Sequence, residues 1–175
     1  MATRTWISAS EITEKVSQLC MDANFNLNED VLDALRDSYE AEVSPVAKEV
    51  FAELLENAKI AHECQMPLCQ DTGVAVVFVE MGEDVEIIGG RLCDAIHEGV
   101  REGYKKGFLR KSMVKDPLNR INTGDNTPAI IHTEFTRESH LKITFMAKGG
   151  GCENMSRLAM LTPADGKAGV INFVV

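Results

Sequence analysis

Apolar residues recur at helical spacing through the first third of the chain and predict successive helices. The first helix begins after Ser8, which together with Glu11 fits a capping box. Its apolar stripe places the Cys20 thiol in the protein core, and the stripe consists of Ile12, Val16, Leu19, Cys20 and Ala23.

Two more helices are predicted before residue 65. The second runs from Glu29 to about Glu42 and is expected to bury Leu32, Leu35 and Tyr39. The third begins at Ser44-Pro45, because serine favours the cap position and proline favours the first turn, and it ends near His62. Its apolar stripe is the most regular in the chain and consists of Ala47, Val50, Phe51, Leu54, Leu55 and Ala58. We therefore expect a lead-in of three helices.

Beyond this lead-in the pattern becomes that of a sheet. The apolar run from Val74 to Met81 predicts a buried strand, and a short extended piece follows from Val85 to Ile88. A helix is expected from Arg91 to about Lys105. Ala129 to Phe135 and Leu141 to Ala147 predict two strands around a charged turn. The predicted fold class is α/β (α+β), with N-terminal helices followed by a mixed β-sheet packed with helices.

The last part of the chain is predicted to be helical. A helix is expected from about Asn154 to Leu161, after which Thr162-Pro163 interrupts the chain. A new apolar stripe of helical type then continues to the last residue, Val175. Because no repeat or linker is found, we expect residues 1–175 to form a single domain, truncated at its C-terminal end.

Composition and charge narrow the classes of function. The chain has 175 residues, of which 45% are hydrophobic and 26% charged, values typical of a globular protein with a core. The net charge of −9, without a basic stripe, argues against a nucleic-acid partner. No apolar stretch approaches the roughly 20 residues of a membrane span. An odd number of irregularly spaced cysteines, five in all, favours a reducing cytoplasm over a disulfide framework.

Three polar, glycine-containing segments lie beside apolar runs, where folds often carry function. They are residues 67–73 (PLCQDTG), 122–128 (NTGDNTP) and 148–154 (KGGGCEN). Cys64 and Cys69 could bind a metal, but a zinc site usually needs four ligands and no second pair is present. A cysteine nucleophile with a histidine base is possible in principle, although none of the four histidines has a local signature.

The run of three glycines has two readings. Backbone N–H groups at such a turn can bind an anion, which Arg110 could clamp from the other end with a bidentate contact. The same glycines could simply form a tight turn between a strand and a helix. The residues by themselves leave both readings open.

The three segments Leu68–Gly73, Asn122–Pro128 and Ala147–Gly151, in this order, resemble the iron–sulfur-dependent class I fumarate hydratases. More narrowly, nearly the whole chain is similar to the N-terminal part of the α subunit of the two-subunit form, a close relative of L(+)-tartrate dehydratase. The resemblance implies a [4Fe–4S] cluster held by three cysteines, with one iron acting as Lewis acid. Cys69 matches the first ligand. The other two are expected outside this chain, and Cys152 is interpreted as a bystander.

The resemblance also implies roles for four further residues. Gln70 and Arg110 would bind substrate carboxylates, and Gly151 would donate its backbone N–H to the substrate. Asp71 would orient or deprotonate a threonine base from the β subunit. These roles agree with the general requirement that a dicarboxylate be met by cationic and N–H donors at both ends.

The reaction implied is the reversible hydration of fumarate to (S)-malate in the cytoplasm, by an αβ hetero-oligomer or a dimer. Partners expected are this small dicarboxylate substrate and a fumarase β subunit, with no nucleic acid and no membrane. The isolated chain is expected to be inactive, because two cluster ligands and the β-subunit residues are missing. One alternative is an L(+)-tartrate dehydratase α subunit. Another is an inactive truncated remnant, kept as a binding or assembly module.

Overall fold

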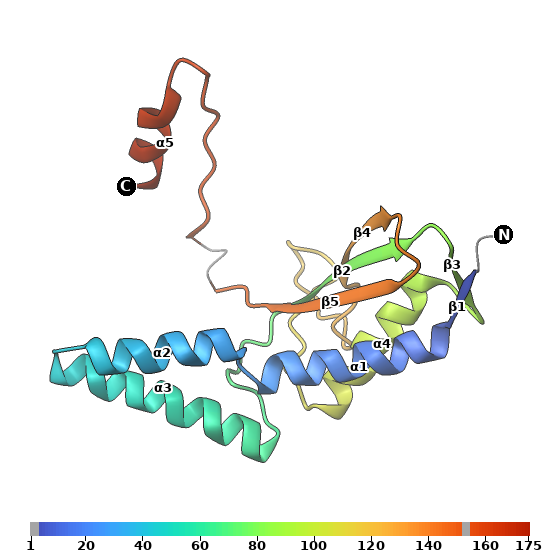
Figure 1. Ribbon diagram of the computed structural model, residues 1–175, viewed down its shortest axis with the longest axis horizontal. Coiled ribbons are helices and arrows are strands. Elements are labelled where there is room, and N and C mark those ends of the chain that lie inside the picture. Colours follow the sequence, from blue (N-terminus) through green and yellow to red (C-terminus); the bar gives the residue numbers. More distant parts are fainter. Residues whose placement is uncertain (1–3, 152–154) are drawn as a thin grey trace.

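A computed structural model describes residues 4–151 and 155–175 of the protein. Two helices, α1 (Ala9–Phe25) and α4 (Leu92–Lys106), lie side by side and cover one face of a three-stranded sheet (Figure 1). A helical hairpin of α2 (Glu29–Ala41) and α3 (Pro45–Cys64) projects from one end of these layers (Figure 1). The predicted fold class is confirmed: long N-terminal helices precede a mixed sheet packed against helices.

The central strand of the sheet is β2 (Val74–Gly82), the apolar run recognised in the sequence. It pairs in parallel with β4 (Ile130–Thr136) and antiparallel with β5 (Leu141–Lys148). Two short strands, β1 (Thr5–Ser8) and β3 (Val85–Ile88), form a separate parallel pair. β1 was not predicted, because its four residues become a strand only through pairing with residues about 80 positions away.

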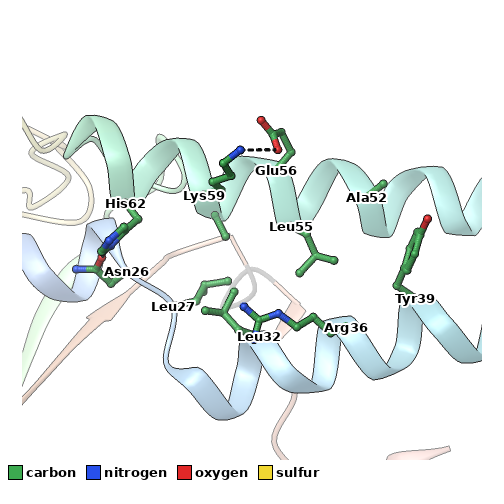
Figure 2. Close-up of a pocket in the computed structure, with 11 residues that line it drawn as sticks. Asn26, Leu27, Leu32, Arg36, Tyr39, Ala52, Leu55, Glu56, Lys59 and His62 are labelled. Carbon is green, nitrogen blue, oxygen red and sulfur yellow. Dashed lines mark hydrogen bonds and ion pairs between the residues drawn. The ribbon is translucent and has the colours of Figure 1, made fainter.

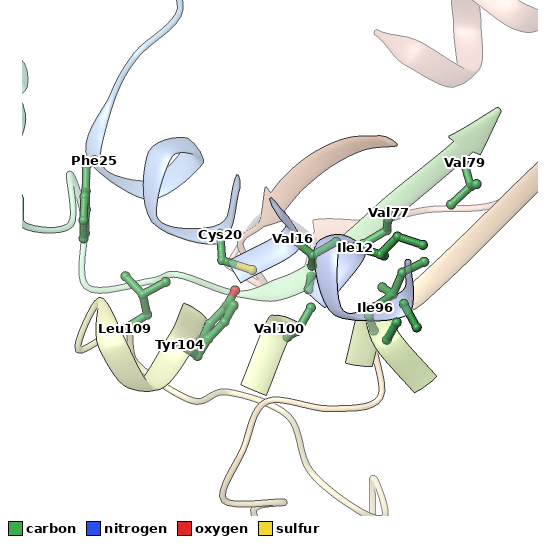
Figure 3. Packing of buried hydrophobic residues seen from close by; sticks show 14 residues of the cluster. Ile12, Val16, Cys20, Phe25, Val77, Val79, Ile96, Val100, Tyr104 and Leu109 are labelled. Carbon is green, nitrogen blue, oxygen red and sulfur yellow. The ribbon is translucent and has the colours of Figure 1, made fainter. Parts of the chain in front are cut away.

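The core lies between the sheet and the two covering helices (Figure 3). Alternate residues of β2 point toward the helices, and Val77 and Val79 lie against the apolar faces of α1 and α4. Cys20 is fully buried here, which confirms its predicted place in the core. Gly103 of α4 faces it so closely that a Cβ atom at Gly103 would lie 2.6 Å from the Cys20 Cβ. The absence of a side chain therefore allows the two helices to approach.

The hairpin consists of α2 (Glu29–Ala41) and α3 (Pro45–Cys64), and it is less buried than its apolar stripes predicted. Leu32, Leu35 and Tyr39 were expected to be buried, yet α2 buries no residue and these side chains are only half-buried. Val50 and Leu54 on α3 are 51% and 45% exposed. Helical periodicity correctly predicted both helices, but it could not show that each packs mainly on the other and not on the core.

The C-terminal part departs from the sequence prediction. Asn154 lies outside the described residues, and residues 155–161 do not form the expected α-helix. Leu158 and Met160 are each 89% exposed, so the predicted helix would have no surface on which to bury its apolar face. The following apolar stripe does form a helix, α5 (Gly166–Val174), as predicted. No helix in the described ranges is long and apolar enough to cross a membrane.

Candidate functional site

The Cys69 turn connects α3 to β2 and is fixed at both ends. At its start, the Leu68 N–H donates to the Asn24 carbonyl (2.9 Å), and the Asn57 side chain donates to the Leu68 carbonyl (3.0 Å). At its end, Gly73 has φ +55°, and a Cβ atom there would lie 2.0 Å from the carbonyl oxygen of Lys148. Only glycine can therefore occupy this position without moving β5.

This close approach places the Cys69 turn beside the triple-glycine turn at the end of β5. The carboxylate Oδ2 of Asp71 accepts hydrogen bonds from the backbone N–H groups of Gly150 (3.1 Å) and Gly151 (3.3 Å). A Cβ atom at Gly149 would come within 3.0 Å of the same oxygen. Of the two readings of the glycine run, the structure supports an anion-binding turn, and the anion bound is the side chain of Asp71.

Cys69 and Gln70 lie exposed in the same turn. The Cys69 sulfur accepts a hydrogen bond from the backbone N–H of Asp71 (3.4 Å). This bond makes the turn compact and leaves the thiol at the surface, where a ligand can reach it. The sequence predicted both residues for the site, and the structure places them beside Asp71.

Arg110 is brought to the same region by the segment that follows α4. The hydroxyl of Thr72, a side chain only 1% exposed, donates to the Arg110 carbonyl (2.6 Å). The Thr72 carbonyl in turn accepts from the buried hydroxyl of Tyr104 (2.8 Å), so the turn is tied to α4 in the core. Arg110 itself is exposed. Four of the five predicted site residues, Cys69, Gln70, Asp71 and Arg110, are therefore carried by two segments in direct contact.

The third glycine-containing segment, residues 122–128, packs against α4. Asp125 accepts hydrogen bonds from Arg101 Nε (2.9 Å) and from the N–H and hydroxyl of Thr127 (3.0 and 2.8 Å). Burial by itself raises the pKa of Asp125, but the bonds from Arg101 and Thr127 outweigh it and hold that pKa well below its usual range. One turn earlier on α4, His97 Nδ1 accepts from the Ala129 N–H (3.2 Å).

Sequence reasoning identified the 122–128 segment but assigned no role to its individual residues. Neither Arg101 nor His97 was singled out for the site. Their spacing of four positions on α4 is the signal that would have placed both on one face of that helix.

A groove of about 540 Å³ lies between α2 and α3, apart from these segments (Figure 2). Leu27, Leu32 and Leu55 point into it, and Arg36 lies along its wall (Figure 2). Arg36 is already paired with Glu29 and Asp33 of its own helix. The groove contains none of the predicted site residues, so it is not the candidate site.

The cysteines bear on the iron–sulfur cluster that the motifs imply. Cys64, Cys69 and Cys93 are exposed free thiols, whereas Cys152 lies outside the described residues. Within residues 4–151 and 155–175, no group of three or more histidine, cysteine or acidic side chains is arranged to hold a metal. Cys69 fits the part of a single exposed thiolate ligand, and the described residues do not complete a cluster.

Comparison with known proteins identifies the family. The family described as Fumarate hydratase (Fumerase) matches residues 13–175, which is most of the chain. The protein therefore belongs to the fumarate hydratase family, as the three motifs indicated.

The chain is 39% identical over 173 residues to the protein named "Putative L(+)-tartrate dehydratase subunit alpha" of Methanocaldococcus jannaschii, covering 94% of this chain and 60% of that relative. It is 29% identical over 171 residues to "L(+)-tartrate dehydratase subunit alpha" of Escherichia coli K12, covering 95% of this chain and 56% of that relative. The same values hold for the subunit of that name from Shigella boydii serotype 4. The chain thus spans somewhat more than half the length of these curated relatives.

Proposed function

We propose that the chain is part of the α subunit of a hydro-lyase, an enzyme that removes water from a four-carbon dicarboxylate or adds water to it. L(+)-tartrate dehydration is favoured over fumarate hydration. The observation that carries this choice is the similarity along nearly the whole chain to proteins named as the alpha subunit of L(+)-tartrate dehydratase. Of the two reactions considered from the sequence, the alternative is therefore better supported than fumarate hydration.

The substrate is proposed to bind where the Cys69 turn, the Arg110 segment and the triple-glycine turn meet. A dicarboxylate carries two negative charges and needs donors at both ends. Arg110 supplies a guanidinium for one carboxylate, and the amide of Gln70 adds a neutral donor. The Gly151 N–H is directed at an anion already, since it donates to Asp71 at 3.3 Å. We propose that a substrate carboxylate replaces Asp71 at this N–H.

This exchange gives Asp71 a defined part in the reaction. While its Oδ2 accepts from Gly150 and Gly151, two backbone groups hold the carboxylate against the glycine turn. Substrate that takes over the Gly151 N–H weakens this hold. The carboxylate can then accept the proton of a threonine base supplied by the partner subunit, the role expected from the family.

The proposed dehydration of L(+)-tartrate balances without any oxidant. A base removes the proton from one carbinol carbon, and hydroxide leaves the neighbouring carbon and takes up a proton to form water. The product is an enol, whose keto form is oxaloacetate. Cys69 would be one ligand of a [4Fe–4S] cluster. When bound, this cluster supplies a Lewis acid for the departing hydroxyl. Its remaining ligands are expected outside the described residues.

A β subunit is proposed as the partner, because the relatives named above are alpha subunits.

The rival proposal is an inactive remnant that serves in binding or assembly. The two are distinguished by producing the chain together with its β subunit under anaerobic conditions and measuring iron per αβ unit and water loss from L(+)-tartrate, with fumarate and malate assayed in parallel. Turnover of tartrate that Cys69→Ser abolishes together with the iron supports the proposal. An iron-loaded complex active on fumarate alone would refute the choice of tartrate. A stable complex that stays without iron and turnover even when the residues expected to supply the remaining cluster ligands are present would support the remnant.

A further inference from the structure

Asn126 is the most deeply buried polar residue near the candidate site. Its side chain is fully buried, and its backbone has φ +62°, in the left-handed region where asparagine is one of the few residues found. Burying an amide costs free energy unless its donors and acceptors are satisfied. Asn126 satisfies them through backbone groups of two other segments, so its contacts define how those segments are arranged.

The contacts require an amide. Oδ1 accepts hydrogen bonds from the backbone N–H groups of Ser112 (2.7 Å) and Met113 (3.1 Å), and Nδ2 donates to the Gly73 carbonyl (3.2 Å). The reverse orientation would set the NH₂ group against two N–H donors, so the hydrogen-bond network fixes the assignment. An ionised aspartate would lack the donor for Gly73, and leucine would lack donor and acceptor alike.

The two partners of this side chain are the two segments that carry four of the five predicted site residues, all except Gly151. Gly73 is two residues after Asp71, and Ser112 is two residues after Arg110. Asn126 therefore joins the Cys69 turn to the Arg110 segment through a single side chain. The Thr72 hydroxyl makes a second link by donating to the Arg110 carbonyl.

Asn126 is itself flanked by residues that are hydrogen-bonded to α4. On one side Asp125 is bonded to Arg101, and on the other the Ala129 N–H donates to His97. Both partners belong to α4, whose Ile96 and Val100 are fully buried in the core. The position of Asn126 is thus set by a core helix, and Asn126 in turn sets the positions of the Cys69 turn and the Arg110 segment.

We propose that Asn126 is the positioning residue of this site: it fixes the Cys69 turn relative to Arg110 and thereby sets the spacing between Asp71 and the arginine. The catalytic consequence rests on the proposed function, because it requires that a dicarboxylate be bound between these segments. The positioning itself does not, and it can be measured on the chain without substrate.

The first test is hydrogen–deuterium exchange, followed by mass spectrometry on the 175-residue chain. Asn126→Ala is expected to raise exchange in residues 69–74 and 110–114 together. The matched control is Ser17→Ala, because Ser17 is also buried (2% exposed) but its hydroxyl has no hydrogen-bond partner among the described residues. Unchanged protection of both segments in a folded Asn126→Ala chain would overturn the proposal, as would equal loosening in the Ser17→Ala control.

Asn126→Asp provides a second measurement if the alanine variant fails to fold. The carboxylate keeps the acceptor for Ser112 and Met113 and loses only the donor to Gly73. Once protonated, it can donate again, so acid should restore protection of residues 69–74 relative to the wild-type chain at the same pH. Loosening of residues 69–74 that does not depend on pH would contradict the assigned donor.

The third measurement uses the αβ enzyme and separates this inference from the proposed function. Asn126→Asp is expected to lower kcat/KM for the dicarboxylate about tenfold or more near neutral pH, with KM and kcat both affected because both segments move. Altered exchange in an αβ complex that turns over neither tartrate nor fumarate would leave Asn126 as the link and refute the function. If the wild-type enzyme is active and the variant shows unaltered exchange and kinetics, the proposed function stands and the positioning role of Asn126 is refuted.

Discussion

Replacing Gly73 by alanine tests whether the two turns of the site meet as described. The added Cβ atom would lie 2.0 Å from the Lys148 carbonyl oxygen, 2.3 Å from its carbon and 2.6 Å from the Gly149 nitrogen. All three are backbone atoms, so no flexible side chain can move away to relieve the clash. The end of β5 must shift, and with it the glycine turn that binds Asp71.

The expected cost has two parts. Alanine at φ +55° is strained by about 1–2 kcal/mol, as for any residue with a Cβ atom in the left-handed region. Forcing an extra methyl group into a packed site adds about 1–3 kcal/mol. The total of about 2–5 kcal/mol is a large fraction of the roughly 5–15 kcal/mol by which domains are stable.

Chemical denaturation followed by circular dichroism measures this loss, with Gly89→Ala as the matched control. Gly89 also has a positive φ, +79°, but a Cβ atom there would meet nothing within 4 Å. The control should therefore show the strain part alone. If the two variants lose equal stability, the close approach of Gly73 to β5 does not exist and the site geometry built on it is wrong.

Three further predictions concern single side chains. Because the folded-state pKa of Asp125 is lowered, its contribution to stability is complete above its unfolded pKa of about 4 and is lost as pH falls through the lower folded value. Asp125→Asn should therefore flatten the acid side of a plot of unfolding free energy against pH. An unchanged acid side would contradict the Arg101 contact. Asp71→Ala should lower the unfolding free energy by roughly 1–2 kcal/mol, because the Gly150 and Gly151 N–H groups lose their acceptor. Asp71→Asn keeps an acceptor oxygen and should lose less. Equal losses in the two variants would argue against these two hydrogen bonds. Burial raises the pKa of the Cys20 thiol to about 12. Site-resolved alkylation should therefore label the exposed Cys69 in the folded chain, and Cys20 only after unfolding. Labelling of Cys20 in the folded chain would place it outside the core.

The choice between tartrate and fumarate follows from the relatives and not from the residues of the site. Arg110, Gln70 and the Gly151 N–H would bind the carboxylates that both substrates share. None of these groups is assigned to the hydroxyl that tartrate carries and fumarate lacks. The discriminating contact is therefore expected from the partner subunit or from residues beyond those described, and the parallel assays of the αβ complex are designed to reveal it.

The motifs were informative because each combines a local backbone requirement with a chemical group. Gly73 follows directly after Asp71 and Thr72, so the sequence already showed that an acidic turn ends in a residue able to adopt a positive φ. It could not show that this glycine is pressed against Lys148. That contact arises from the antiparallel pairing of β2 with β5, which pairs Val74 with Lys148, 74 positions further along the chain.

Local sequence determined most of the elements, because side-chain spacing and caps such as Ser8 and Ser44 act over a few residues. α3, α4 and β2 each begin and end within about two residues of prediction, and α1 begins directly after Ser8 as predicted. Tertiary structure decided the rest. It formed β1 by pairing with a distant strand, left α2 without a buried residue, and gave residues 155–161 no surface on which to form a helix. It also brought Asp71 to the Gly150 and Gly151 N–H groups, and Asn126 to Gly73 and Ser112. The physical reason is that burial and hydrogen bonding depend on which distant groups meet, whereas periodicity records only which face of an element is apolar.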